Sequence, residues 1–407
     1  MPDIQAFHAV PRRLAALRAA ATTLCAALLV AAGAVLPAMA QSAFETRATT
    51  AYVLDLNTGT VLLDKNGTEP QPPASMSKLM TLLMLFEAVR DNPNISLDTE
   101  FQVSTKAREM GGSTMFLNER DRPTAEELIK GIIVQSGNDA TVVVAEGLAG
   151  DENRFARLMT ERARELGMTD TTLTNASGWP EDGHRMSARD LAILSKHLIE
   201  DFPEYYPYFA MAEWPFDGRA PSNRFNRNPL LNLGIGADGL KTGHTQEAGY
   251  GLAGSAVQDG RRVIFVISGL PSAETRAEEA ERIVRWAFQQ FVETRLAVAG
   301  TVIAEAPVWM GDETSVGLVA PRDLLVLRDA VAGSGITTEL VYSAPVPAPI
   351  AAGDTVAELV VTSPGLPETR HPLVADRDVV YGGFVPRLRS AGLTLIDRLV
   401  GQASALF

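Results

Sequence analysis

A serine and a lysine form the pattern Ser-x-x-Lys directly after a proline-rich stretch of the chain. Ser75 and Lys78 follow residues 70–73 and open the apolar run 79–86. Proline is tolerated at a helix start but not inside a helix, so Ser75 is predicted at or just inside a helix N-terminus, with Lys78 one turn later on the same face. A hydroxyl beside a desolvated amine suits nucleophilic catalysis, because the lysine can take the serine's proton. An N-cap serine with a surface lysine is the simpler interpretation of these residues alone.

The composition is that of a globular protein with more than one domain. The chain has 407 residues, of which 46% are hydrophobic and 21% are charged. Its formal net charge is -13. A surface that binds nucleic acid needs clustered Lys and Arg to neutralise phosphates, so this acidic chain argues against a nucleic-acid partner.

Residues 1–40 have the three parts of a secretory signal peptide. Arg12, Arg13 and Arg18 form a basic start, an uncharged run rich in Ala, Leu and Val follows, and Ala38-Met39-Ala40 supplies an A-x-A cleavage site. A transmembrane anchor is the less favoured alternative because of that cleavage site. The sequence therefore predicts an exported protein.

The single cysteine, Cys25, lies within this signal peptide. The mature protein is therefore expected to have no disulfide, no thiol nucleophile and no cysteine metal site. The histidines show no metal-ligand spacing, and no metal or other cofactor is expected. Export without disulfides suits a bacterial periplasm, where a large core can stabilise the fold by itself.

Residues 44–295 are predicted to form one α/β (α+β) domain, with strands at both ends and helices between them. The patterns predict β-hairpins at 51–64 and 249–270. Two capping boxes are expected at helix starts, one formed by Thr124 with Glu127 and one formed by Ser187 with Asp190. Further helices are expected at 140–148, 152–166, 187–200 and 274–292.

The sequence pattern changes after residue 296. Short Val- and Leu-rich runs alternate with Gly and Pro across 297–382, which predicts a small all-β domain that serves as a spacer or binding module. Residues 386–407 have helical amphipathicity but are too interrupted to span a bilayer. They fit an anchor that lies in the interface of a membrane. A terminal helix that packs on the body of the protein, or makes a dimer contact, fits them as well.

Three short motifs follow one another along the chain. The pair Ser75 and Lys78 at a helix start is followed by Ser136-Gly137-Asn138 between two helices and by Lys241-Thr242-Gly243 on a strand. Each motif is common alone. A trio of this kind, in which the middle motif is Ser-Asp-Asn rather than the Ser-Gly-Asn of this chain, is typical of class A β-lactamases and penicillin-binding proteins. Their joint order makes a catalytic Ser75 the better interpretation.

Longer stretches of the chain resemble the D-alanyl-D-alanine carboxypeptidases, the low-molecular-mass penicillin-binding proteins of the S11 serine peptidase family. The resemblance covers about residues 51–288, through 111–117, 135–140 and 238–245, and extends less specifically to the β-rich part and the tail. It implies a β-lactamase/transpeptidase-like fold, an antiparallel sheet with helices on both faces. It also implies removal of the terminal D-alanine from peptidoglycan pentapeptide stems, inhibition by β-lactams, and attachment to the periplasmic face of the inner membrane.

The resemblance assigns a role to each reacting side chain. Ser75 would attack the carbonyl between the two D-alanines and form an acyl-enzyme, with Lys78 as general base. Burial and nearby Lys241 would lower the pKa of Lys78. Ser136 would relay a proton toward the leaving nitrogen, and Asn138 would hold Lys78 or the substrate amide.

The third motif would bind the substrate. Lys241 and Thr242 would face the substrate's terminal carboxylate, and Gly243 would let the substrate backbone approach the strand. The backbone N–H groups of Ser75 and His244 would form the oxyanion hole. The side chain of His244 would not act as a base, because lysine takes that role.

Two arginines enter by resemblance only. Arg227 and Arg276 match family positions near the substrate carboxylate and Lys241. A surface arginine is an equally good interpretation of each.

Three other functions are compatible with parts of the pattern. A β-lactamase needs a deacylating glutamate, but Glu181 and Asp182 do not match that loop of class A enzymes, and Gly137 stands where those enzymes have Asp. An endopeptidase of the same fold usually lacks the second domain. A non-catalytic penicillin-binding sensor or scaffold is disfavoured because all the motif side chains are present.

Overall fold

The computed structural model describes residues 44–219, 221–330 and 335–383. The predicted signal peptide, residues 1–40, and the predicted membrane anchor, residues 386–407, lie outside the described residues. Within the described ranges, no helix combines the length and the apolar character needed to cross a membrane.

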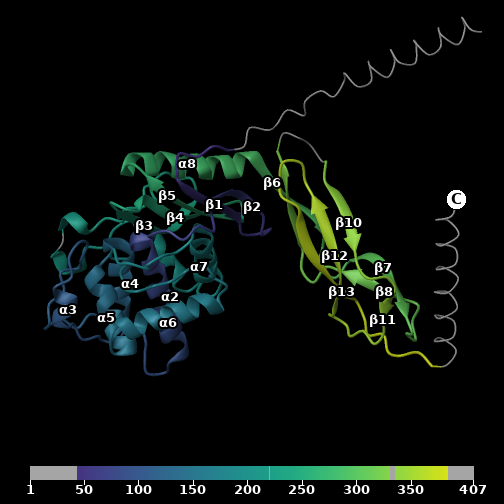
Figure 1. The fold of residues 1–407 in the computed structure, drawn as a ribbon, viewed down its shortest axis with the longest axis horizontal. Helices are drawn as coiled ribbons and strands as arrows, with labels where there is room; N and C mark the ends of the chain where they lie inside the picture. Colours follow the sequence, from purple (N-terminus) through teal and green to yellow (C-terminus); the bar gives the residue numbers. More distant parts are fainter. Residues whose placement is uncertain (1–43, 220, 331–334, 384–407) are drawn as a thin grey trace, which may run out of the picture. The chain divides into compact units, whose positions relative to one another are not determined.

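A five-stranded antiparallel sheet forms the centre of the first part of the chain (Figure 1), in the order β2-β1-β5-β4-β3. The strands are β1 (Thr50–Asp55), β2 (Val61–Lys65), β3 (Ala237–Thr245), β4 (Gly249–Gln258) and β5 (Arg261–Leu270). β5 is central and its residues Val263 to Ile267 are all buried, so its apolar run is continuous rather than alternating. The early hairpin thus pairs, through β1, with the strand β5 about two hundred residues later, as the pairing of Tyr52 with Val266 shows.

Helices cover both faces of this sheet. Figure 1 places α8 on one face and α2 and α7 on the other. The helix α2 is buried through Leu79, Leu82, Leu83 and Phe86, which explains the long apolar run of its sequence. This layered arrangement confirms the predicted fold class. The helices are α2 (Lys78–Asp91), α3 (Thr105–Arg108), α4 (Ala125–Lys130), α5 (Asn138–Ala149), α6 (Glu152–Glu165), α7 (Ala188–Glu200) and α8 (Ala273–Gln290), with short turns η1 (Ala74–Ser77), η2 (Gly131–Gln135), η3 (Tyr206–Ala210), η4 (Phe216–Gly218) and η5 (Pro221–Asn223).

One of the two predicted capping boxes forms in full. The Thr124 hydroxyl accepts from the backbone N–H of Glu127 at 3.2 Å, and the Glu127 carboxylate accepts from the backbone N–H of Thr124 at 2.9 Å. At α7 only the first half forms: the Ser187 hydroxyl accepts from the backbone N–H of Asp190 at 3.1 Å. The Asp190 side chain is shorter than the glutamate of a full capping box, and its carboxylate instead accepts from the Thr171 hydroxyl at 2.8 Å. Ser187 is therefore an N-cap as predicted, but the prediction of a second capping box was wrong.

The second part of the chain is all β, as predicted. One sheet has the order β10-β12-β13-β8-β7-β11, and β6 pairs with β9. Its own apolar core includes Val316, Leu318 and Leu373. The helix expected to reach residue 292 ends earlier, because Phe291 already pairs with Asp329. The strands are β6 (Phe291–Ala297), β7 (Val302–Trp309), β8 (Ser315–Val319), β9 (Leu324–Asp329), β10 (Thr337–Val341), β11 (Val346–Pro347), β12 (Thr355–Thr362) and β13 (Thr369–Ala375).

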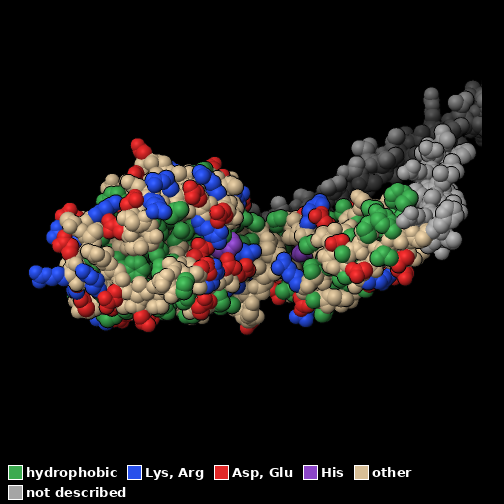
Figure 2. Space-filling model, turned by 90° about the horizontal axis from the view of Figure 1, so that it is seen from below, with side chains coloured by type: hydrophobic (Ala, Val, Ile, Leu, Met, Phe, Trp, Pro, Cys, Tyr) green, Lys and Arg blue, Asp and Glu red, His purple; other side chains and the backbone are tan. Residues whose placement is uncertain are grey.

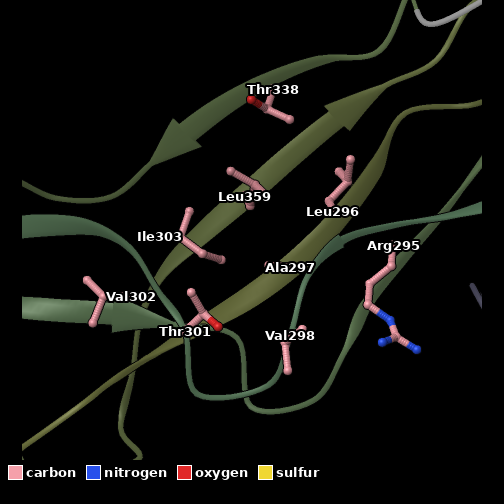
Figure 3. Close-up of a pocket in the computed structure, with 9 residues that line it drawn as sticks. All are labelled: Arg295, Leu296, Ala297, Val298, Thr301, Val302, Ile303, Thr338 and Leu359. Atoms are coloured by element: carbon pink, nitrogen blue, oxygen red, sulfur yellow. The ribbon is translucent and has the colours of Figure 1, made fainter.

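A pocket of about 600 Å³ lies in this β-rich part (Figure 3). Apolar side chains such as Leu296, Val302 and Leu359 line it, and Arg295 stands at its edge. Among the described residues that line this pocket there is no acid, histidine or cysteine. This pocket therefore offers no acid–base chemistry, and a spacer or binding role for the β-rich part stays a prediction.

Charged side chains of both signs are interspersed on the face that Figure 2 shows. On this face, the mixture does not provide the one-sided basic surface that nucleic acids require.

Candidate active site

Ser75 lies in η1, a single 3-10 turn between the prolines and α2. Ala74 directly before it has a φ of 49°, in the left-handed region, so the chain bends sharply into the helix. Its neighbours Ala74, Met76 and Ser77 are buried, whereas Ser75 is only partly buried. The hydroxyl is thus accessible at the helix start that the sequence predicted.

Lys78 is the first residue of α2 and is completely buried. Its Nζ lies 2.9 Å from Ser75 Oγ, 2.7 Å from Asn138 Oδ1 and 2.5 Å from the backbone oxygen of Ser177. A neutral amine has two N–H groups and one lone pair. The two carbonyl oxygens can take the two N–H groups, which leaves the lone pair for the proton of Ser75. The interpretation of Lys78 as a surface lysine is therefore wrong.

Burial lowers the pKa of Lys78 to about 7, and the positive charge of Arg227 lowers it as well, while the Asp139 carboxylate opposes the shift. Arg227 is thus a cation that acts on Lys78 beside the expected Lys241. Lys241 has a pKa lowered well below its ordinary value, first by burial and then by the charge of Lys78. The two buried lysines repel each other, so each disfavours the protonated form of the other.

This pKa predicts how acylation of Ser75 depends on pH. Protonated Lys78 cannot accept a proton, so the rate should rise as pH increases through about 7 and level off above it. One unit below that midpoint the rate should be about tenfold lower than the plateau. The measurement is the second-order rate of labelling by a fluorescent penicillin across the pH range. A profile that stays flat, or rises only near the ordinary lysine pKa, contradicts the assignment of Lys78 as base.

Ser136 is held in a left-handed conformation with φ 59° and ψ 36°, between the π-helical turn η2 and α5. A residue other than glycine is uncommon there and costs energy, so the neighbouring elements must impose it. Its hydroxyl accepts a hydrogen bond from Lys241 Nζ at 3.0 Å. Because Asn138 binds Lys78 from the next turn, the middle motif touches both lysines.

The third motif lies on β3, which packs against the turn that carries Ser75. Lys241 and Thr242 are buried, and Lys241 Nζ also donates to the backbone oxygen of Thr242 at 3.1 Å. A Cβ on Gly243 would lie 2.9 Å from the backbone oxygen of Pro73 and 3.1 Å from Met76 Cγ. Gly243 is therefore required by the packing of β3 on this turn, a reason that the sequence did not reveal.

The two arginines reach the site from different elements. Arg227 Nη1 donates to Ser113 Oγ at 2.9 Å, and Arg276 Nη2 donates to the backbone oxygen of Arg227 at 3.3 Å. Both positive charges lower the pKa of Lys241. Arg276 is 8% exposed, so the interpretation of a surface arginine fails for that residue.

His244 follows Gly243 on β3 and is exposed. Its ring stacks on Tyr250 with 3.9 Å between the ring centroids. The side chain is therefore occupied at the surface of the strand, and its backbone N–H stays the predicted oxyanion donor. Among the described residues, no group of three His, Cys, Asp or Glu side chains is placed to hold a metal ion.

The matching family profiles cover both parts of the chain. The S11 peptidase profile, described as D-alanyl-D-alanine carboxypeptidase, matches residues 37–272. The chain belongs to this family. A second profile, the C-terminal domain of penicillin-binding protein 5, matches residues 291–381.

Individual members of the D-alanyl-D-alanine carboxypeptidase family align over most of their length. DacF of Bacillus subtilis is 32% identical over 84% of this chain and 88% of its own, and DacD of Escherichia coli is 33% identical over 83% and 88%. Penicillin-binding protein 5 from Haemophilus influenzae superposes with a TM-score of 0.76 at 30% identity, over 83% of this chain and 98% of its own. The ampicillin-bound form of penicillin-binding protein D2 from Listeria monocytogenes has a TM-score of 0.55 at 31% identity, over 60% and 99%.

Asp139 belongs to this site in the structure, although the sequence analysis gave it no role. Asp139 is buried directly after Asn138, and its carboxylate accepts from the backbone N–H groups of Met115 at 3.0 Å and Leu117 at 3.1 Å. Burial raises its pKa, against the effect of those N–H groups. Asp139 thus holds the loop 111–117 on the start of α5, and its position next to the Ser-Gly-Asn motif was the available signal.

Replacing Asp139 with alanine should lower the free energy of unfolding by about 3 kcal/mol, because buried N–H groups lose a charged acceptor. Asp139→Asn keeps one acceptor oxygen and should lose less. Chemical denaturation measures both, with Asp182→Ala at an exposed position as control. An Asp139→Ala protein as stable as the control would show that the loop holds without this carboxylate.

Proposed function

We propose that this chain is a serine-type D-alanyl-D-alanine carboxypeptidase that removes the terminal D-alanine from peptidoglycan pentapeptide stems through an acyl-enzyme. The observation that carries the proposal is the buried amine of Lys78, 2.9 Å from Ser75 Oγ, with two carbonyl oxygens on its N–H groups. No histidine or metal is required, because this amine supplies the base. The names of the relatives support the substrate.

Acylation begins when Ser75 Oγ attacks the carbonyl carbon between the two D-alanines. Lys78 takes the hydroxyl proton as the new C–O bond forms. Backbone N–H groups of Ser75 and His244 hold the oxyanion, and loss of one such donor typically costs about a hundred- to a thousandfold in rate. The C–N bond then breaks, and the stem stays on Ser75 as an ester.

The leaving D-alanine needs a proton and a place for its carboxylate. Ser136, whose hydroxyl accepts from Lys241 Nζ, passes the proton held by Lys78 toward the leaving nitrogen. The substrate carboxylate faces Lys241 and Thr242, and the positive charges of Arg227 and Arg276 act on the same place. A bound carboxylate favours the cationic form of Lys241 and so opposes the effect of burial on its pKa. Water then enters and hydrolyses the ester.

β-Lactams imitate the D-alanyl-D-alanine end and acylate Ser75 in the same way. The ampicillin-bound relative supports this inhibition. Rapid release of the drug needs a general base beside the ester. The sequence analysis considered Glu181 for that role. Its Oε2 accepts hydrogen bonds from Asn175 Nδ2 at 3.0 Å and from Thr174 Oγ1 at 2.9 Å. This arrangement favours a penicillin-inhibited carboxypeptidase over a β-lactamase.

The test of the proposal is D-alanine release from diacetyl-Lys-D-Ala-D-Ala by the mature protein. We expect stoichiometric D-alanine and its loss after benzylpenicillin. Preferential cleavage of cross-linked muropeptide dimers would make the chain an endopeptidase, and rapid penicillin turnover a β-lactamase. Labelling without any hydrolysis would leave a penicillin-binding sensor or scaffold.

We further propose that the protein is exported and works at the periplasmic face of the inner membrane. Residues 1–40 have the sequence of a cleaved signal peptide, and residues 386–407 have the amphipathic sequence of an interfacial anchor. The peptidoglycan substrate is assembled on that side of the membrane, which fits both segments.

Truncation after Gly383 should release the mature protein from the membrane fraction while leaving D-alanine release within about twofold of the full chain. Fractionation of cells that express the full or the truncated form measures membrane association, and an assay of D-alanine release compares their activities. If the full mature chain already stays in the soluble fraction, residues 386–407 are not an anchor and pack on the body of the protein or on a second copy.

A further inference from the structure

The connection between α6 and α7 supplies the third contact of Lys78. Residues 174–184 run along the start of α2, where the backbone oxygen of Ser177 receives Lys78 Nζ at 2.5 Å. Gly178 follows with a φ of 77°, and a Cβ there would lie 1.9 Å from the backbone oxygen of Ala74. This connection is thus pressed directly against the turn that carries Ser75.

The side chain of Asn175 makes most of the hydrogen bonds that hold the turn 177–179 in shape. Asn175 Oδ1 accepts from the backbone N–H groups of Ser177 at 3.1 Å, Gly178 at 2.9 Å and Trp179 at 3.1 Å. Its Nδ2 donates to the backbone oxygen of Trp179 at 3.0 Å and to Glu181 Oε2 at 3.0 Å. Asn175 is only 8% exposed, so water cannot replace these bonds without opening the connection.

We propose that Asn175 is a positioning residue for acylation: its side-chain amide fixes the turn 177–179 so that the Ser177 carbonyl takes one N–H of Lys78 and aims the lone pair of Nζ at Ser75. This inference rests on the proposed function of Ser75 and Lys78. If the Ser177 oxygen is displaced, Asn138 Oδ1 is the one carbonyl oxygen that still accepts from the Lys78 amine. The amine can then rotate about its Cε–Nζ bond, and its lone pair no longer points at Ser75. A misplacement of about 1 Å at such a contact can cost about a hundredfold in rate.

The chemistry of the residue explains why an amide suits this position. The Asn175 oxygen accepts from three backbone N–H groups of the turn, while its nitrogen donates to the backbone oxygen of Trp179 and to the carboxylate of Glu181. Alanine removes both functions. Aspartate keeps the acceptor, loses the donor and places a negative charge beside Glu181 and near Lys78.

The first arm of the test is the acylation rate of Asn175→Ala by fluorescent penicillin, counted per folded molecule. We expect a fall of about tenfold to a hundredfold in the acylation rate, with little change in the affinity of the first, non-covalent complex. The matched control is Thr171→Val, in the same connection, which loses a buried hydrogen bond to Asp190 and does not touch Lys78. The control should acylate within about twofold of wild type.

The second arm is the pH profile of Asn175→Asp, which stays informative if the alanine variant does not fold. The charged groups that already act on Lys78 or are acted on by it are Arg227, Asp139, His184 and Lys241. An added carboxylate stabilises the protonated amine, so the acid limb of the acylation profile should move to higher pH. A role confined to stability would lower the amount of folded protein and leave that limb in place.

Three outcomes overturn the inference: a wild-type rate per folded molecule for Asn175→Ala, an unmoved acid limb for Asn175→Asp, or the same defect in Thr171→Val. A wild-type protein that penicillin does not label refutes the proposed function instead. The two failures are therefore distinguishable in one series of measurements.

Discussion

Replacing Ser75 with alanine is expected to abolish D-alanine release, with a fall in rate of about a millionfold to the level of the uncatalysed background. The reason is chemical: the acyl-enzyme forms on Ser75 Oγ, and the partly buried turn η1 offers Lys78 no other hydroxyl in contact with its Nζ. The folded state should change little, since the Ser75 side chain is not part of the buried core. Covalent labelling by penicillin should disappear together with hydrolysis.

Ser77→Ala is the matched control for this experiment. Ser77 lies in the same turn, but its hydroxyl donates to the backbone oxygen of Ala74 at 3.0 Å and faces the protein interior. Its loss should cost about 1 kcal/mol of stability and leave labelling nearly unchanged. Persistent labelling of Ser75→Ala, or loss of labelling only in Ser77→Ala, would mean that the wrong serine has been chosen.

Replacing Lys78 with glutamine should lower the acylation rate by about a thousandfold to ten-thousandfold. Glutamine can still donate to Asn138 Oδ1 and the Ser177 oxygen, so the buried acceptors keep partners, but an amide cannot take the proton of Ser75. The rise in rate near pH 7 should vanish as well, because the group that titrates there is gone. Stopped-flow measurement of penicillin acylation at several pH values provides both readings.

Lys65→Gln is the control for the loss of a lysine. Lys65 Nζ donates to the backbone oxygens of Thr46 at 3.0 Å and Ala48 at 2.7 Å, outside the site around Ser75. Its replacement should leave the pH profile unchanged. If Lys78→Gln retains the acid limb, another group carries the proton and the neutral-amine mechanism fails.

The parts of the site that follow from residue types were predictable. Ser75, Ser136 and Lys241 stand in motifs whose spacing indicates their chemistry, and helix or strand periodicity placed each motif on the right element. The β-rich part was predictable too, because its short apolar runs between glycines and prolines are typical of strands. These signals are local, so one sequence contains them in full.

The rest of the site depends on contacts between segments far apart in the chain. The Ser177 carbonyl that meets Lys78 is a backbone group, and no side-chain pattern reports it. The left-handed backbone of Ser136 is imposed by η2 and α5 rather than by serine's own preference. The packing role of Gly243 requires knowledge that β3 lies against the turn of Ser75. Physical reasons of this kind become visible only when the elements are in place.

The most direct test of the account is to locate the covalent adduct of penicillin on the protein. Mature wild-type protein is treated with benzylpenicillin at about pH 8, digested with trypsin and analysed by fragmentation mass spectrometry. The adduct should lie in the peptide that extends from Asn66 to Lys78, and the fragment masses should place it on Ser75 and not on Ser77. An adduct on any other residue, or an intact protein without an adduct, would contradict the central claim that Lys78 activates Ser75.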